Sequence, residues 1–319
     1  KWTEYLFAFI IIIILEIIFF YVRSEFKKYS IAEFSHDEQW KKTLISFAYG
    51  LIFTLPQILV INILFYVRKQ YKYSFKKTVE IPQFDLANAP KVTVQLPMFN
   101  EMYVAERIID TVAEFDYPRD KFQIQVLDDS TDETKEIIAA KVLEVAARGI
   151  NIQHIHRVDR TGYKAGALDA AMDQVQGEFI AIFDADFVPD KDFLLRTMPY
   201  FNTDKIGVVQ TRWGHLNKTY SLLTELQAFG LNGHFAIEQG GRNAQGHYIN
   251  FNGTAGVWRK ACIEDAGGWE HDTITEDLDL SYRAQMRGWK FNYLEEVESP
   301  AELPITMSAL KSQQHRWMK

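Results

Sequence analysis

Cysteine is nearly absent from this sequence, because Cys262 is the only one among 319 residues. A single thiol cannot form an internal disulfide, so we expect a reducing compartment. Excess positive charge is also missing, since the formal net charge is −7. Proteins that bind nucleic acids usually present a basic face, so we expect no nucleic-acid partner. The Walker A, G-x-G-x-x-G and G-x-S-x-G patterns do not occur, which disfavours kinases, dehydrogenases and serine hydrolases.

Long hydrophobic runs are concentrated near the start of the chain. Residues 6–22 are apolar except for Glu16, and residues 44–67 contain only a few polar side chains. Each run reaches or approaches the ~20 residues that cross a bilayer as a helix. We therefore predict a membrane region at residues 1–77, with candidate transmembrane helices at 6–22 and 44–67 and the lipid bilayer as a partner. Alternatively, the first run is an uncleaved anchor or an interfacial helix; no small-residue cleavage site of a signal peptide follows it.

Basic residues indicate how this region is oriented. A cluster follows the second run and consists of Arg68, Lys69, Lys72, Lys76 and Lys77. Such clusters are typical of the cytoplasmic side of a membrane, so we expect residues 78 onward to be cytoplasmic. The loop between the two runs is basic as well, and the count of positive charges alone is therefore a tie. The expected location is a cell membrane, inner or plasma, with more than one pass.

The remainder of the chain has the pattern of an α/β domain. After a polar linker at residues 78–90, short β-branched runs alternate with segments of helical period. The predicted strands are 91–96, 124–127, 152–156, 179–183 and 207–211, and the predicted helices are 104–115, 134–147, 164–175 and 191–201. This alternation predicts a doubly wound, mainly parallel sheet in a domain at residues 91–319.

Acidic residues follow two of the predicted strands. Asp128 and Asp129 come directly after the second strand, and Asp184 and Asp186 directly after the fourth. Ligands bind such sheets at the carboxyl ends of the strands. Two acidic sites on one sheet edge repel each other unless a cation or ligand lies between them, and carboxylates suit a hard divalent cation. We therefore expect a metal site that includes Asp184 and Asp186.

A third acidic group, Glu276 and Asp277, opens a predicted helix. Thr275 is the expected N-cap, Gly288 the stop, and Leu278, Tyr282 and Met286 share one face. Acidic residues in a first turn also stabilise the helix dipole, which by itself would explain both carboxylates. Two tryptophans and two glycines are nearby in the sequence, and aromatic surfaces beside carboxylates suit a sugar: Gly267, Gly268, Trp269 and Trp289.

Three further groups have side chains that can bind a ligand. Gln313, Arg316 and Trp317 combine an amide, a guanidinium and an indole, which can bind hydroxyls, phosphate and a pyranose face, although an amphipathic helix beside a membrane explains them equally well. Arg157, Arg160 and Lys164 lie in or after a glycine-containing loop and form either a diphosphate clamp or a basic surface loop. His154 and His156 alternate along a strand. Because no further ligand occurs at metal spacing, we interpret them as structural.

Eight short motifs follow one another along the chain, each weak alone but specific as an ordered set: Gln95-Leu-Pro-Met-Phe-Asn-Glu101, Asp128-Asp129-Ser130, Lys164-Ala-Gly-Ala-Leu168, Asp184-x-Asp186, Gln210-Thr-Arg-Trp213, Phe251-Asn-Gly-Thr254, Thr275-Glu-Asp277 and Gln313-x-x-Arg316-Trp317. This set resembles the processive family 2 glycosyltransferases, and within them the cellulose-synthase-like enzymes that make β-1,4-glucan or mannan backbones, including bacterial relatives. The resemblance covers about residues 91–319.

The resemblance implies a GT-A type fold and a role for each matching residue. Glu101 and Asp129 match contacts to the nucleotide base and ribose, and Lys164 and Asp184 match positions near the diphosphate. Asp186 matches the carboxylate that binds Mg²⁺ or Mn²⁺, and Asp277 matches the general base. Gln313, Arg316 and Trp317 match the motif that holds the donor diphosphate and the acceptor end. Asn252, Gly253 and Thr254 match the acceptor-terminus motif, although Asn252 stands where cellulose synthases usually have cysteine, which leaves the polymer open.

The implied function is an inverting hexosyltransferase with a cytoplasmic catalytic domain. It would move a sugar from a nucleotide-sugar of the UDP-glucose or GDP-mannose type to the non-reducing end of a β-linked polysaccharide. The nearest alternative keeps this chemistry but uses a lipid acceptor, as ceramide glucosyltransferases do. A nucleotidyltransferase gives no role to Asp277 or Trp317, and a non-catalytic scaffold does not explain the full set of acidic positions. Because the chain begins with Lys1 and ends just after Trp317, we expect a longer gene product, with further membrane helices or subunits for polymer export.

Overall fold

The computed structural model describes residues 84–272 and 275–317, together with Leu64, Val67, Arg68, Lys72 and Pro82; the side chains of Arg316 and Trp317 are not described. The chain divides into two compact units, Lys1–Lys69 and Gln70–Lys319. The candidate spans at 6–22 and 44–67 lie outside the described residues, apart from Leu64 and Val67. Within the described part of the chain, no helix is both long enough and apolar enough to cross a bilayer.

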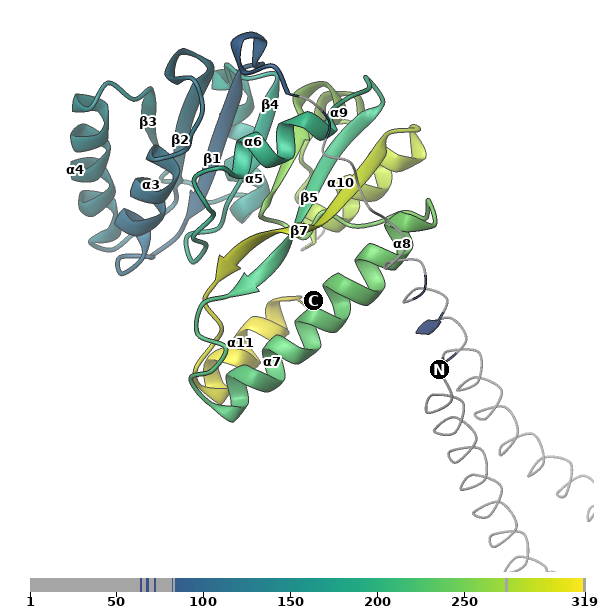
Figure 1. The fold of residues 1–319 in the computed structure, drawn as a ribbon. Coiled ribbons are helices and arrows are strands. Elements are labelled where there is room, and N and C mark those ends of the chain that lie inside the picture. The colour runs from purple at the N-terminus through teal and green to yellow at the C-terminus, as the bar shows by residue number, and fades with distance from the viewer. Residues whose placement is uncertain are drawn as a thin grey trace, which may run out of the picture. The chain divides into compact units, whose positions relative to one another are not determined.

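A seven-stranded sheet in the order β3-β2-β1-β4-β6-β5-β7 forms the centre of the second unit (Figure 1). β1 pairs in parallel with β2 and β4, β2 with β3, and β5 with β7. β6 is antiparallel to both of its neighbours, β4 and β5. The α/β class and the mainly parallel sheet are confirmed. The strands are β1 (Val92–Met98), β2 (Phe122–Asp128), β3 (Ile152–His156), β4 (Phe179–Ile182), β5 (Ile206–His215), β6 (Gly256–Arg259) and β7 (Lys290–Ala301).

Two apolar layers cover the sheet. One side packs against α3, α4 and α6 through Ile108, Val112 and Ile138, which join the β1 side chains in one buried cluster. The other side packs against α5, α9 and α10 through Leu168, Cys262 and Leu280. The alternation of strand and helix in the sequence thus becomes a three-layer sandwich. The α-helices are α3 (Ala105–Ala113), α4 (Thr134–Ala147), α5 (Tyr163–Ala171), α6 (Phe193–Thr197), α7 (Leu222–Asn232), α8 (Gly240–Ala244), α9 (Lys260–Asp265), α10 (Glu276–Met286) and α11 (Met307–Trp317).

Several element ends differ from the prediction. The helices predicted at 164–175 and 191–201 each end in a short 3-10 turn, Met172–Gln174 and Met198–Tyr200. A π-helix, Gly233–Gln239, joins α7 to α8. β6 and β7 were not predicted, because β6 has only four residues and β7 carries several charged side chains. Two more 3-10 turns, Leu86–Asn88 and Arg119–Lys121, precede β1 and β2.

The direction of β6 positions the loop before it. In the β4–β6 pair, Ile182 at the carboxyl end of β4 lies opposite Gly256 at the amino end of β6. The chain therefore enters β6 from the sheet edge at which β1, β2 and β4 end. This topology places residues 251–255 beside the residues that follow β4.

Candidate active site

Lys164 links three of the predicted motifs. Its Nζ atom donates to Asp184 Oδ1 at 2.5 Å and to the Gly253 carbonyl at 2.8 Å. Nearby carboxylates hold the pKa of Lys164 above its usual value, although burial opposes this shift; Asp184, Glu276 and Asp277 contribute. The structure thus brings α5, the end of β4 and the loop before β6 to one point.

The loop before β6 has an unusual backbone. Gly253 has φ +74° and Ala255 has φ +56°, a region that side-chain-bearing residues rarely adopt. Gln210 in β5 bonds this loop through both polar atoms of its side chain. The nitrogen donates to the Thr254 and Ala255 carbonyls, and the oxygen accepts from the backbone amide of Asn252. A fully buried glutamine in β5 therefore holds the loop in shape. We had given Gln210 no role, although a glutamine after Val208 and Val209 in an apolar strand is a visible signal.

Thr254 and Asn252 differ in their contacts. Thr254 Oγ1 accepts from the Asp184 amide at 2.8 Å, so this predicted acceptor residue also positions the metal-site loop. The Asn252 side-chain amide nitrogen is buried and has no hydrogen-bond partner among the described residues. Burial of such a donor is costly without a partner, so Asn252 is suited to receive a ligand oxygen.

Asp277 lies in the first turn of α10, next to Gly253. A Cβ atom at Gly253 would lie 3.2 Å from Asp277 Oδ2. A helix N-terminus by itself favours the ionised carboxylate. Here burial instead raises the pKa of Asp277 above its usual value, against the hydrogen bond from the Leu278 amide. Burial also raises the pKa of Glu276, a second carboxyl of this cluster that we had treated only as part of a motif.

Asp186 is the most perturbed carboxyl of the site. Burial, together with the negative charges of Asp184 and Glu101, raises the pKa of Asp186 to about 7. These carboxyl groups form an oxygen-rich donor set around Asp186. Such a set fits the ligand preference of Mg²⁺ or Mn²⁺.

Asp129 is held by a cation instead of facing solvent. Arg157 donates from Nε to Asp129 Oδ1 at 2.8 Å and from Nη2 to Oδ2 at 2.6 Å, while Asp129 is 4% exposed. The Arg160 guanidinium lies 3.3 Å from the centre of the Phe99 ring. Both arginines of the expected diphosphate clamp therefore pair with Asp129, Arg157 through two hydrogen bonds and Arg160 through Nε, which lies 3.9 Å from Asp129 Oδ2.

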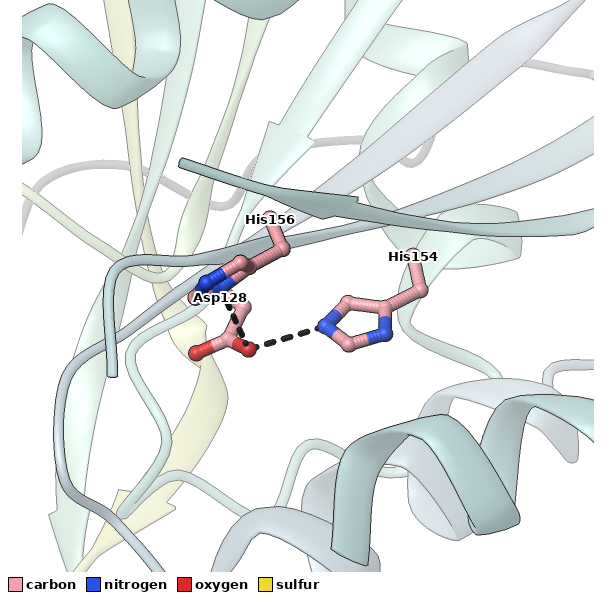
Figure 2. Close-up of side chains that lie close together, drawn as sticks. All are labelled: Asp128, His154 and His156. Atoms are coloured by element: carbon pink, nitrogen blue, oxygen red, sulfur yellow. Dashed lines mark hydrogen bonds and ion pairs between the residues drawn. The ribbon is translucent and has the colours of Figure 1, made fainter. Parts of the chain in front are cut away.

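Asp128 bonds both histidines of β3, as Figure 2 shows. Its Oδ2 atom lies 2.8 Å from His154 Nε2 and 3.2 Å from His156 Nδ1. Burial alone would raise the pKa of Asp128, but hydrogen bonds from His154 and Ser130 outweigh it and lower the pKa. Our statement that the histidines have no further ligand at metal spacing was wrong, because strand pairing supplies Asp128 as a third.

The C-terminal motif lies on α11. The segment before this helix is bonded to α7, since Gln227 Nε2 donates to the Pro304 carbonyl at 2.9 Å. Within the described residues, no hydrogen bond joins Gln313 to the acidic cluster, and the side chains of Arg316 and Trp317 lie outside the description. The contribution of Gln313, Arg316 and Trp317 to the site stays a prediction.

The expectation that Trp269 and Trp289 form a sugar-binding surface was wrong, whereas the N-cap expectation was confirmed for the position of Thr275. Trp269 is 4% exposed inside the core, and the Trp289 indole donates to Asp265 beyond the far end of α10, so neither offers a sugar-binding surface at this site.

Thr275 occupies the N-cap position, but its side chain makes no capping bond. The predicted apolar face of α10 is largely exposed, with Leu278 38% and Met286 67% exposed; the helix instead buries Leu280, Ser281 and Ala284. Gly288 does follow the helix end, at φ +91°.

The model of the glycosyltransferase like family 2 matches residues 90–319. The chain belongs to this family. It is 42% identical over 265 residues to glucomannan 4-beta-mannosyltransferase 2 of Arabidopsis thaliana, covering 82% of this chain and 50% of that protein. It is 45% identical over 244 residues to probable glucomannan 4-beta-mannosyltransferase 2 of Oryza sativa subsp. japonica, covering 75% and 42%.

The chain spans about half the length of the curated family 2 relatives it matches. Among solved structures, it resembles the mannosyltransferase PcManGT from Pyrobaculum calidifontis in complex with GDP-Man and Mn²⁺. That match has a TM-score of 0.63 and 24% identity and covers 80% of this chain and 68% of the other. This similarity shows the fold, a GT-A-like α/β sheet.

Proposed function

We propose that this chain is the catalytic part of a β-1,4-mannosyltransferase. It transfers mannose from GDP-mannose, with inversion, to the non-reducing end of a mannan or glucomannan chain. The observation that carries the proposal is the convergence of Lys164, Asp184 and Asp277 around Gly253. The similarity to the plant glucomannan mannosyltransferases covers most of this chain and favours mannose over glucose. The relative in complex with GDP-Man supports the choice of donor.

Asp277 acts as the general base in this proposal. A single displacement at the anomeric carbon requires one group to accept the proton of the attacking hydroxyl. Its raised pKa makes Asp277 a stronger base than an exposed aspartate. The positive charge of Lys164 opposes this rise in pKa, and the Gly253 backbone leaves room for a hydroxyl beside the carboxylate. The acceptor end is placed against Asn252, Gly253 and Thr254, with Trp317 as a stacking surface.

The donor occupies the carboxyl edge of β1, β2 and β4. Asp129, which is fixed by Arg157, and Glu101 face the nucleoside, whereas Lys164, Asp184, Gln313 and Arg316 face the diphosphate. Asp186 and Asp184 offer the oxygen ligands for Mg²⁺ or Mn²⁺. When bound, such an ion supplies positive charge that stabilises the departing diphosphate.

The lipid bilayer is the proposed partner of the whole protein, at a cell membrane. The apolar runs at 6–22 and 44–67 are its proposed spans, and the catalytic domain is cytoplasmic, where nucleotide-sugars are made. The described domain adds an observation in support. Leu222, Leu226 and Phe229 recur along α7 at helical spacing and are 71%, 60% and 81% exposed. Such an apolar stripe is typical of a helix that lies on a membrane surface.

A donor screen tests the proposal. The full chain in detergent is incubated with radiolabelled GDP-mannose, GDP-glucose or UDP-glucose, a β-1,4-mannan oligosaccharide and Mn²⁺. We expect transfer from GDP-mannose, into product that an endo-β-1,4-mannanase degrades. Incorporation from UDP-glucose alone would contradict the proposed donor. Label that partitions into the organic phase would favour the lipid-acceptor alternative.

A further inference from the structure

Three metal-ligating side chains converge where the edge strand β3 pairs with β2. His154 and His156 are alternate residues of β3, so their side chains lie on one face. β2 pairs with this strand in a register that sets Asp128 opposite His156. One nitrogen of each ring and one Asp128 oxygen lie within 4.8 Å of one another. This is the one such group of three found among the described residues.

We propose that Asp128, His154 and His156 form a second metal site, which takes Zn²⁺. Two imidazoles and one carboxylate are a typical set of three protein ligands for zinc and leave a fourth position open. The set differs in kind from the all-oxygen group at Asp186, because imidazole favours zinc over Mg²⁺ and Mn²⁺. The two sites therefore select different cations.

The distances suit a tetrahedral ion. Bonds of ~2.0–2.2 Å to nitrogen and oxygen place neighbouring ligand atoms roughly 3.3–3.5 Å apart. Asp128 Oδ2 lies 2.8 Å from His154 Nε2 and 3.2 Å from His156 Nδ1, as Figure 2 shows. The two ring nitrogens lie within 4.8 Å of each other, so rotation of the side chains would bring all three ligand atoms to these spacings around the ion.

The surroundings hold the ligands in place yet leave access. The Ser130 amide donates to Asp128 Oδ1 at 2.8 Å, which directs Oδ2 toward the two rings. Residues that bind zinc are usually held in place by such hydrogen bonds to their second polar atom, which does not contact the metal. The Asp128 side chain is fully buried, whereas the side chains of His154 and His156 are 17% and 29% exposed, so a cation can reach the site from solvent.

A hydrogen-bond network without a metal would have the same distances. Measurement of zinc binding distinguishes such a network from a metal site. The full chain in detergent is stripped of metal, supplied with excess MgCl₂ to occupy the acidic site, and titrated with ZnCl₂ against a chromophoric chelator. CoCl₂ provides a second probe through its visible absorption in a tetrahedral site. The matched control is His247→Ala, because His247 is exposed and far from the cluster in sequence.

We expect the native chain and the His247→Ala variant to bind one equivalent of zinc that the double variant H154A/H156A does not bind. The zinc affinity of the double variant should fall by ~100-fold or more, because loss of even a supporting contact lowers the affinity about 10–100-fold. His154→Gln guards against misfolding, because its amide can still donate to Asp128 but binds zinc poorly. Zinc should raise the unfolding temperature of the native chain and not that of His154→Gln. Equal zinc uptake by all variants, or equal shifts of the unfolding temperature, would overturn the proposal.

Discussion

At the residue scale, burial raises the pKa values of several carboxyl groups in the site. Asp186, Asp277 and Glu276 all have raised pKa values, and burial is the largest cause for each. Lys164 is the cation that opposes this effect in all three. A cluster with one lysine and several carboxyls retains a deficit of positive charge, which a divalent ion can fill.

Asp277→Asn is expected to separate chemistry from donor binding. Asparagine keeps the shape of the side chain but cannot accept the proton, so the transfer rate should fall by ~10²–10⁴-fold while GDP-mannose affinity changes little. Calorimetry and single-turnover transfer provide the two measurements. The control is Asp272→Asn, an exposed position five residues away. A parallel loss of affinity and rate would move Asp277 to a binding role.

Mn²⁺ binding should depend on the ionisation of Asp186. Because its pKa is about 7 in the metal-free protein, a proton competes with the metal below that pH. The Mn²⁺ affinity should therefore fall by roughly tenfold for each pH unit below 7 and level off above it. In the metal-free chain the same shift destabilises the fold as pH rises from about 4 through 7, because the folded state binds the proton more tightly than the unfolded state. Asp186→Asn should thus raise the unfolding temperature at pH 8 and change it little at pH 4. A pH-independent Mn²⁺ affinity would refute this coupling.

At the element scale, the loop at 251–255 depends on β5 and α10 for its shape. Gln210 bonds it from one side, and Ser281 of α10 accepts from the Phe251 amide at 2.9 Å on the other. The loop therefore transmits the position of α10, and of Asp277 at its start, to the acceptor residues. Thr254 extends this link to the end of β4 through Asp184.

Gly253→Ala tests this arrangement. The new methyl group would lie 3.2 Å from Asp277 Oδ2 and force a side chain into a left-handed backbone at φ +74°. We expect a loss of about 1–2 kcal/mol in the free energy of unfolding and a larger loss of transfer activity. Chemical denaturation and a transfer assay measure the two effects. Gly233→Ala is the control, because that glycine is helical and nothing lies within 4 Å of the added carbon. Full activity of Gly253→Ala would show that the close approach to Asp277 is not needed.

At the scale of the whole molecule, the exposed stripe on α7 faces either water or lipid. Cys262 is fully buried, and burial raises its pKa to about 12, so it resists alkylation in the folded chain. An engineered cysteine can therefore carry a polarity-sensitive dye alone. We expect the dye at Phe229→Cys to report an apolar environment when the full chain is reconstituted in a bilayer.

Leu143→Cys is the matched control for this experiment. Leu143 of α4 is 73% exposed, similar to Phe229. The strand that follows α4, β3, lies at one end of the sheet order, whereas the strand that precedes α7, β5, lies near the other end. A dye there should report water. Identical spectra at both positions would refute the contact of α7 with lipid.

Local pattern determined much of this protein. The period of the apolar residues predicts the strands that end at Met98, Asp128 and Ile182, because alternation and burial follow from backbone geometry alone. Since carboxyl ends of parallel strands share an edge, Asp129, Asp184 and Asp186 are predictable at one edge of the sheet, and motif order indicates the family. These inferences need only neighbours in sequence.

Tertiary structure alone decided the remainder. Asp128 meets His154 and His156 through the pairing of two strands, and Gly253 meets Asp277 through the antiparallel entry of β6. The depth at which Trp269 lies, and the pKa of Asp186 near 7, depend on the packing of segments distant in sequence. Burial and charge act through space, and no spacing of residues along the chain encodes the distances on which they depend.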